Sequence, residues 1–375
     1  MTPRCNLERL PTTRPHRVPS PDPYVLLFYR NRFTTQGGPY CHIGLGVNAL
    51  HTTRVLRRLG VATYPYGVWS TQDIRTHLRE HPQATHAVIE APWVSLEETE
   101  RLVTDYPHVH FVVRCHSQIG FLQVEAVSIT LLRELALLAE RVLNLSVAGN
   151  SARFTRFVER AYESRCVYLP NLYDTERAGP KRRGPLDAGR PLRIGSFGAM
   201  RLLKNHTTSA AAALLAARAL GRDLAFWVSV DGNDYGGMSV VYALRAMFAG
   251  LPWAKLVEQP WQDWPAFRRT VAHMDLCVHL SHTETFNITT ADAIAENVPC
   301  VVSPAIEWAP DAWKVDSDRP EDAARVALQL LASDEAAAEG TYALERFVRR
   351  AGLHWLAFLG VLTDPDALAL LGEDA

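Results

Sequence analysis

Two acids eight residues apart follow an apolar run in the second half of the chain. The stretch 281–302 reads SHTETFNITTADAIAENVPCVV, and its acids are Glu284 and Asp292. A carboxylate accepts hydrogen bonds from hydroxyl groups and can hold a vicinal diol. A helix is predicted to start at about residues 287–289, which leaves unpaired N–H groups at its positive end. These N–H groups belong to Phe286, Asn287 and Ile288. The pattern suits an anionic ligand rich in hydroxyls, although an ordinary capped helix would also explain it.

A second cluster combines small residues with two cations. The segment RIGSFGAMRLLKNH (193–206) ends a predicted strand and contains Gly198, Arg201 and Lys204. Glycine lets a ligand approach the backbone closely, and a helix N-terminus beside two cations can hold a diphosphate. The spacing matches neither the Walker A loop nor G-x-G-x-x-G. A strand-to-helix turn with a solvated lysine remains an alternative explanation.

These residues must be positioned by alternating strands and helices. Short β-rich apolar runs are separated by helical patterns, which is typical of βαβ units and parallel sheets. The runs lie at 24–29, 85–93, 108–116 and 141–146, and again at 192–198, 224–232, 254–260, 275–281 and 300–304. We therefore expect an α/β fold with two doubly wound, Rossmann-like domains. Ligands bind at the carboxyl ends of such strands, so the two domains should face each other across a cleft.

The expected domain organisation has five parts. A Pro- and Arg-rich tail covers 1–22, an N-terminal domain 23–172, and a linker rich in Pro, Gly and charge 173–190. A ligand-binding domain covers 191–340, and a helical segment at 341–375 closes the molecule.

The segments SFGAMRLLKNH and ETFNITTADAIAENVPCVVSP resemble the C-terminal domain of retaining GT-B glycosyltransferases, specifically the family-4-like group. The resemblance is strong over about 190–310 and only architectural over 24–175. It implies that Arg201 and Lys204, with Gly198, bind the donor diphosphate. It also implies that Glu284 contacts the donor sugar, with the backbone of 286–288 beside it. Asp292 stands where the family usually has Glu and would contact the ribose with a shorter reach.

The same resemblance assigns roles in the N-terminal half. Gly37 and Gly38 match a glycine-rich loop over the donor phosphates, and His116 matches a histidine near the donor sugar. A hydrogen-bonded core histidine is the alternative for His116. The stretch 168–174, YLPNLYD, resembles the crossing into the second domain.

The resemblance implies sugar transfer with retention from a nucleoside-diphosphate sugar, with UDP the commonest donor nucleotide and GDP or ADP sugars the alternatives. No Asp-x-Asp metal motif stands out, so we expect Arg201, Lys204 and helix N–H groups to neutralise the leaving group without an obligatory metal. Front-face attack would leave Glu284 to position the sugar, with His116 assisting by hydrogen bonding.

The acceptor is less well defined. Residues 1–170 carry 19 Arg and no Lys against 14 acids, although the net charge of the chain is −1. Arginine in YRNRF (29–33), with Arg54, Arg57 and Arg58, would suit a saccharide, a phospholipid, or a hydroxymethylated base in DNA. A merely solvated arginine face, or a general preference for Arg over Lys, would explain them equally well.

Two other functions stay open: a nucleotide-sugar epimerase, which also needs a diphosphate site, and an inactive GT-B scaffold, suggested by Asp292. The composition, 47% hydrophobic and 21% charged, is that of a globular protein. The sequence has no secretory signal and no apolar run long enough to span a membrane, so we expect a cytoplasmic protein. The six scattered cysteines predict neither a disulfide framework nor a zinc site.

Overall fold

The computed structural model describes residues 22–31, 44–123, 126–175, 189–230 and 236–362. The expected tail, the loop with Gly37 and Gly38, most of the expected linker and the last part of the closing segment lie outside these residues. In the described part of the chain, no helix is both long and apolar enough to cross a membrane.

The first half forms a six-stranded parallel sheet in the order β2-β1-β3-β4-β5-β6. Its central strands are buried on both faces, which is why they are continuous apolar runs in the sequence. The strands are β1 (Tyr24–Arg30), β2 (Ala62–Val68), β3 (His86–Glu90), β4 (His110–Cys115), β5 (Leu145–Gly149) and β6 (Cys166–Tyr168).

The two outer strands of this sheet were not predicted from the sequence. β2 contains Pro65, which argues against a central strand. The structure accommodates Pro65 because β2 lies at the edge of the sheet and pairs only with β1. β6 is three residues long and pairs with β5, too short for alternation to reveal it.

The second half forms a five-stranded parallel sheet in the order β11-β10-β7-β8-β9. All five strands fall on the predicted apolar runs. They are β7 (Leu192–Ser196), β8 (Leu224–Ser229), β9 (Ala254–Gln259), β10 (Leu276–His279) and β11 (Cys300–Val302). The predicted pair of doubly wound α/β sheets is therefore confirmed.

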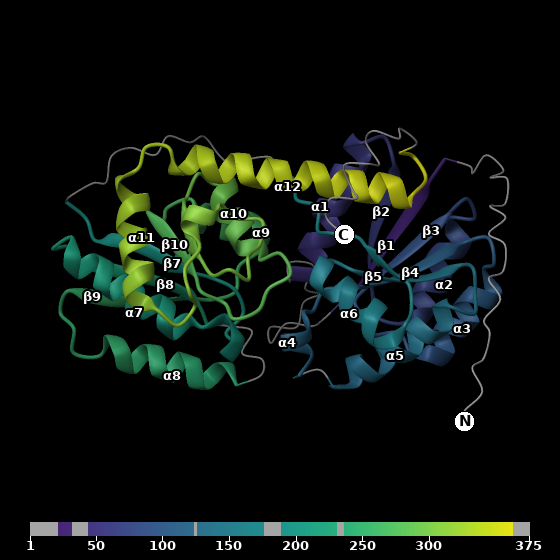
Figure 1. Cartoon of the computed structure of the whole chain (residues 1–375), viewed down its shortest axis with the longest axis horizontal. Coiled ribbons are helices and arrows are strands. Elements are labelled where there is room, and N and C mark those ends of the chain that lie inside the picture. The colour runs from purple at the N-terminus through teal and green to yellow at the C-terminus, as the bar shows by residue number, and fades with distance from the viewer. Residues whose placement is uncertain (1–21, 32–43, 124–125, 176–188, 231–235, 363–375) are drawn as a thin grey trace, which may run out of the picture.

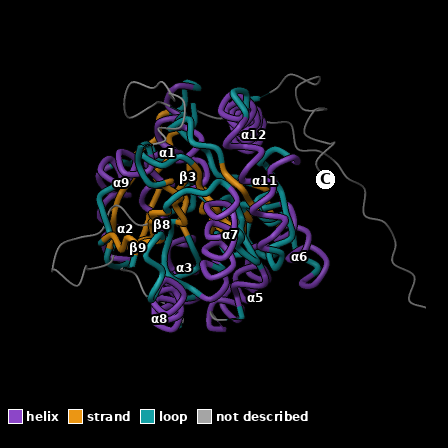
Figure 2. Tube along the Cα trace, turned by 90° about the vertical axis from the view of Figure 1, so that its left-hand side faces the viewer, coloured by secondary structure: helices purple, strands orange, loops and turns teal. Residues whose placement is uncertain are grey.

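Helices surround both sheets, and Figure 1 shows the two lobes side by side. In the end-on view of Figure 2 the strands lie in the interior with helices around them. The helices of the first half are α1 (Gly44–Arg58), α2 (Thr71–Glu80), α3 (Leu96–Asp105), α4 (Ile119–Leu122), α5 (Ala126–Ala139) and α6 (Ala152–Tyr162). Those that follow are α7 (His206–Ala219), α8 (Gly237–Phe248), α9 (Trp264–Val271), α10 (Ile288–Ala295), α11 (Pro320–Ala332) and α12 (Ala336–Phe358).

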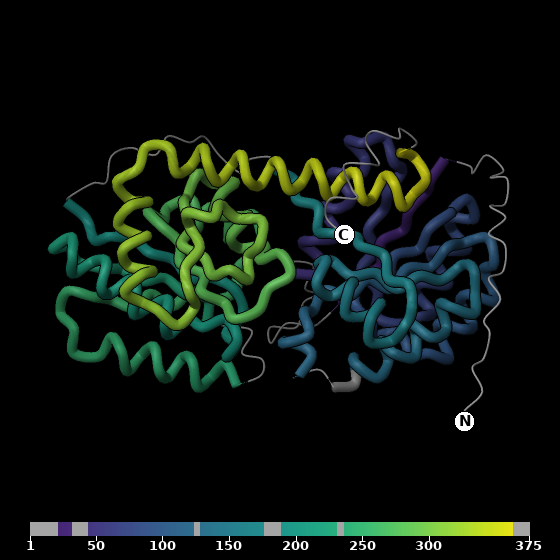
Figure 3. The backbone as a smooth tube through the Cα atoms, in the orientation of Figure 1, coloured from purple at the N-terminus to yellow at the C-terminus, as the bar shows by residue number. Residues whose placement is uncertain are grey.

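Helix α12 crosses from the second lobe to the first, along one side of the molecule (Figure 3). Its early residues Ala336 and Leu344 belong to the core of the second lobe. Its later residues Ala351 and Trp355 pack with β1, β3 and β4 of the first. The Trp355 indole N–H donates a hydrogen bond to the Pro170 carbonyl at 2.8 Å. One helix therefore contributes to both hydrophobic cores.

Candidate active site

The two predicted ligand-binding segments follow neighbouring strands. β7 pairs directly with β10, and the strand order changes direction between them. This is the topological switch point of a doubly wound sheet, where the loops separate and leave a crevice. The loop after β7 carries Gly198, Arg201 and Lys204, and the loop after β10 carries Glu284. The fold therefore brings together residues that lie 80 positions apart in the sequence.

Lys204 and Glu284 form an ion pair in this crevice. The ammonium Nζ of Lys204 lies 2.6 Å from Glu284 Oε1, and the side chains are 22% and 9% exposed. Asn287 Nδ2 donates to the same carboxylate oxygen at 2.9 Å. The Glu284 carboxylate is thus fixed in place by one donor from each loop, which fits a group that orients a ligand.

Asn287 also caps the start of helix α10. It has a left-handed backbone with φ of 60°, and its side-chain oxygen accepts the Thr290 N–H at 2.9 Å. This cap confirms the predicted start of the helix. In the described part of the chain, nothing accepts a hydrogen bond from the N–H groups of Phe286, Asn287 and Ile288. They supply donors beside the ion pair, at the positive end of the helix.

A neutral histidine, His279, connects the two loops. Burial lowers the pKa of His279 to about 3, so the ring carries a single proton. Its Nε2 accepts the Phe197 N–H at 3.3 Å. The proton must therefore be on Nδ1, which donates to Thr290 Oγ1 at 2.8 Å. His279 thus ties the end of β7 to the first turn of α10.

Gly198 and Arg201 belong to the loop after β7, which forms one side of the crevice. Gly198 has φ of 117°, a conformation that strains residues with a side chain. Arg201 extends toward the first half of the chain, and its guanidinium lies 4.9 Å from the centroid of the Phe121 ring in α4. Arg201 thus contacts the first lobe, while Lys204 contacts Glu284.

His116 lies at the end of β4 in a buried polar network. Its Nε2 hydrogen-bonds the Glu90 carboxylate, and its Nδ1 lies 3.2 Å from Asn150 Nδ2. Burial lowers the pKa of His116, while Glu90 opposes that shift. The Arg114 guanidinium binds both oxygens of Glu90, at 3.1 and 3.0 Å. His116 is accordingly held in a fixed orientation by protein groups.

One side chain connects this network to the Glu284 loop. Thr285 Oγ1 donates to the backbone carbonyl of His116 at 3.1 Å. The same oxygen accepts from Asn150 Nδ2 at 3.1 Å. Since Thr285 follows Glu284 directly, the structure places the His116 backbone next to the predicted sugar-binding loop.

Asp292 is in a different environment. Its side chain is buried in α10, and Oδ1 accepts hydrogen bonds from Tyr173 at 2.6 Å and Trp264 at 2.9 Å. Burial raises its pKa to about 6, although both hydrogen bonds lower it. Both hydrogen bonds to Oδ1 come from protein groups, so this oxygen already has its partners.

Asp292→Asn should therefore stabilise the protein at pH 8. The amide oxygen can still accept from Tyr173 and Trp264, while the cost of a buried charge disappears. Because the folded pKa of Asp292 is raised, its stabilising contribution is present at low pH and is lost as pH rises through 6. We expect a gain of about 1–3 kcal/mol in unfolding free energy at pH 8 and little at pH 4. Denaturant unfolding at both pH values tests this, and a pH-independent difference would contradict it.

The arginines expected to face an anionic acceptor have partners within the protein. Arg58 Nη1 lies 2.6 Å from Asp174 Oδ1, and Arg54 lies 3.6 Å from the other oxygen of Asp174. Arg57 donates to the Thr63 carbonyl at 2.7 Å. Each of the three arginines thus has a protein partner, while the side chains of Arg54 and Arg58 remain about half exposed.

Several residues of the site were not identified from the sequence. Glu90 ends an apolar strand and reads as an ordinary strand terminus, and Asn150 and Thr285 have no motif around them. The Phe286 side chain is buried against Trp308 and Phe347, with ring centroids 5.3 Å apart in each case. Its side chain therefore belongs to the core, and the Trp308 indole N–H donates to its backbone carbonyl at 2.6 Å.

Comparison with known proteins gives matches by structure but not by sequence. No protein-family model and no curated protein matches the sequence. The structure does match solved glycosyltransferases. HepE of Anabaena, in complex with UDP and glucose, is 14% identical with a TM-score of 0.60, over 90% of this chain and 99% of its own. The trehalose-6-phosphate synthase OtsA is 10% identical with a TM-score of 0.61, again over 90% and 99%.

A third similar structure is TarM of S. aureus, solved with fondaparinux, α-GlcNAc-glycerol and UDP. It is 13% identical with a TM-score of 0.54 over 73% of this chain, and the match spans 55% of the TarM chain. Together with the two facing doubly wound sheets, these matches establish the GT-B fold that the sequence motifs predicted.

Proposed function

We propose that this protein is a retaining, family-4-like GT-B glycosyltransferase that moves a sugar from a nucleoside-diphosphate sugar to a hydroxyl acceptor. The observation that carries this proposal is the Lys204–Glu284 pair at the start of α10, at the switch point of the second sheet. A cation, a carboxylate and free helix N–H groups in one crevice match the chemistry of a sugar diphosphate.

In this proposal different residues contact different parts of the donor. Lys204, Arg201 and the N–H groups of 286–288 neutralise the diphosphate, and Gly198 gives it room. Gly37 and Gly38 remain proposed contacts to the same phosphates. Glu284 accepts hydrogen bonds from the sugar hydroxyls. When the diphosphate arrives, it competes with Glu284 for Lys204, which frees the carboxylate for the sugar.

The reaction we propose is a front-face displacement with retention. As the bond from the anomeric carbon to the diphosphate breaks, negative charge grows on the leaving oxygen, and Lys204 and the helix N–H groups stabilise it. The acceptor hydroxyl adds to the same face and its proton passes to the leaving phosphate. His116 remains our proposed hydrogen-bonding partner of the sugar. Because Glu90 holds its Nε2, that bond must replace the contact of Nδ1 with Asn150. We expect this chemistry to proceed without an obligatory metal.

Asp292 remains our proposed contact to the ribose. Since both bonds to Oδ1 come from protein groups, a ribose must use the other oxygen of the carboxylate. Asp292→Asn should consequently weaken donor binding less than loss of Lys204 does.

The proposal is tested by screening UDP, GDP and ADP sugars for thermal stabilisation of the protein. A UDP-sugar is expected to raise the melting temperature most, in line with the UDP bound in the HepE and TarM structures. Transfer to saccharide, phospholipid and hydroxymethylated DNA acceptors follows, with and without a chelator. NMR of the product reports the anomeric configuration. An inverted product would refute retention, and conversion of the donor without acceptor would indicate an epimerase. Donor binding without transfer to any acceptor would indicate an inactive scaffold.

A further inference from the structure

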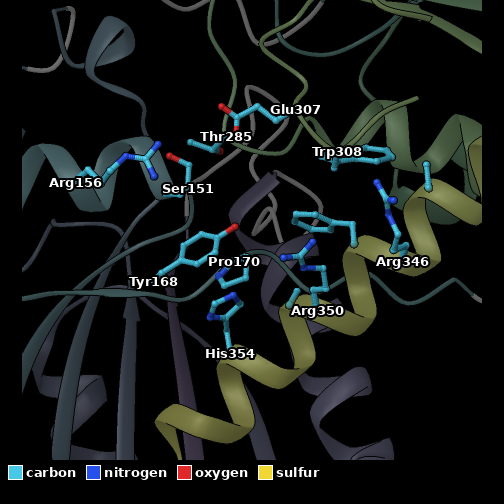
Figure 4. Close-up of a pocket in the computed structure, with 14 residues that line it drawn as sticks. Ser151, Arg156, Tyr168, Pro170, Thr285, Glu307, Trp308, Arg346, Arg350 and His354 are labelled. Atoms are coloured by element: carbon cyan, nitrogen blue, oxygen red, sulfur yellow. The ribbon is translucent and has the colours of Figure 1, made fainter. Parts of the chain in front are cut away.

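A pocket of about 400 Å³ lies between the two lobes and beneath helix α12. Its walls come from the start of α6, from the end of β6 and the segment after it (Tyr168 and Pro170), from the loops at 285 and 307–308, and from one face of α12 (Figure 4). Thr285 belongs to its lining, but Gly198, Lys204 and Glu284 do not. The pocket is therefore separate from the proposed donor site, although it adjoins the same loop.

The lining is basic. Arg156 approaches from α6 on one side, and Arg346 and Arg350 approach from successive turns of α12 on the other (Figure 4). Glu307 is the single carboxylate of the lining, and it is already paired with Arg153 at 2.5 Å. The guanidinium of Arg156 makes no hydrogen bond or ion pair with any residue that the structure describes. Among the described residues, the charge of Arg156 is therefore without a counterion.

The position of α6 adds to this charge. Ser151 caps the helix by accepting the Phe154 N–H at 3.2 Å, and Ser151 and Ala152 both line the pocket. The positive end of an eleven-residue helix therefore lies beside Arg156. Helix end and arginines together favour an anion with several acceptor oxygens, as in a phosphate.

The other residues of the lining indicate the kind of molecule to which the phosphate is attached. Tyr168, Trp308, Phe347 and His354 supply aromatic faces, and Tyr168 and His354 meet edge to face at 4.7 Å. Aromatic faces beside hydrogen-bonding groups pack well against the carbon-bound hydrogens of a sugar ring. The volume is of the size that holds a compact polar metabolite rather than a polymer.

We propose that this pocket is a second ligand site, which binds a small phosphate monoester with a polyhydroxylated body, such as a sugar phosphate. Arg156, Arg346 and Arg350 bind the phosphate, and the aromatic residues hold the body. The site does not depend on the proposed glycosyl transfer, because none of its lining residues takes a role in donor binding.

The test measures binding of a hexose 6-phosphate, glycerol 3-phosphate and inorganic phosphate by isothermal titration calorimetry. We expect the hexose phosphate to bind most tightly and the unphosphorylated hexose to bind far more weakly. Arg156→Ala, and separately the double variant Arg346→Ala/Arg350→Ala, should each weaken the phosphate ester at least about tenfold. The matched control is Arg349→Ala, on α12 but exposed and outside the lining, which should leave affinity unchanged.

Two further titrations separate this site from the donor site. UDP affinity should be the same in the arginine variants as in the wild type, which also shows that they are folded. Lys204→Ala should weaken UDP but not the hexose phosphate. The proposal is overturned if no ester binds the wild type below about 10 mM. It is also overturned if the pocket variants bind normally, or if Lys204→Ala abolishes ester binding.

Discussion

Lys204→Ala is expected to lower kcat/KM for sugar transfer about 10²- to 10³-fold while the protein stays folded. Lys204 is the cation that contacts the Glu284 loop, at 2.6 Å, and it lies beside the N–H groups at the start of α10. Removing it takes away charge stabilisation that grows as the diphosphate departs. The side chain is partly exposed, so its loss leaves no large cavity. Steady-state transfer assays with the preferred donor measure the effect.

Glu284→Ala should cause a similar loss, and the double variant should lose much less than the product of the two. Residues that act on one ligand as a unit give non-additive effects. Lys255→Ala is the control, because Lys255 is an exposed lysine on β9, outside the site. Wild-type turnover in purified, folded Lys204→Ala and Glu284→Ala would refute the site assignment.

Glu90→Ala should reduce the unfolding free energy by about 3–5 kcal/mol. Glu90 and Arg114 are both fully buried, and the guanidinium contacts both carboxylate oxygens. Removing the acid leaves a buried arginine without its charge partner, and His116 loses the group that orients it. Denaturant unfolding measures the change in stability, and transfer activity should fall as well.

The matched control is Glu97→Ala. Glu97 pairs with Arg101 one turn away on the exposed face of α3, and such a pair contributes at most about 1 kcal/mol. Burial by itself would raise the pKa of Glu90, but Arg114 and His116 lower it by more, so the net shift is downward. Its contribution is therefore present at neutral pH and lost as pH falls through the folded pKa. Equal losses of stability in Glu90→Ala and Glu97→Ala would show that the buried pair stabilises the protein no more than the exposed pair does.

The fold was largely predictable because its strands are buried in parallel sheets. Such strands appear as apolar runs without alternation, and every strand of the second sheet lies on one. The exceptions have local reasons. Pro65 in β2 conflicts with strand propensity and is tolerated only because β2 is an edge strand. The three-residue β6 is too short to produce a pattern.

The approach of the two loops of the proposed donor site was predictable for a similar reason. Gly198, Lys204 and Glu284 lie directly after strands, and the carboxyl ends of neighbouring parallel strands converge. The rest depends on contacts distant in sequence. Nothing near Asn150 or Thr285 predicts that one amide will join them across the two lobes. Nor does the spacing of Glu284 and Asp292 reveal that Tyr173 and Trp264 enclose the second acid.

Helix α12 has a consequence for how this chain folds during its synthesis. The apolar face formed by Val25, Leu27, Val88 and Val112 is covered partly by Ala351, Trp355 and Leu359. A ribosome makes those three residues only after the strands of both sheets. The first lobe must therefore wait, with part of its hydrophobic surface unprotected, until the second lobe has been translated. Such surface is open to aggregation or to chaperones. A chain that stalls before residue 350 would lack this cover.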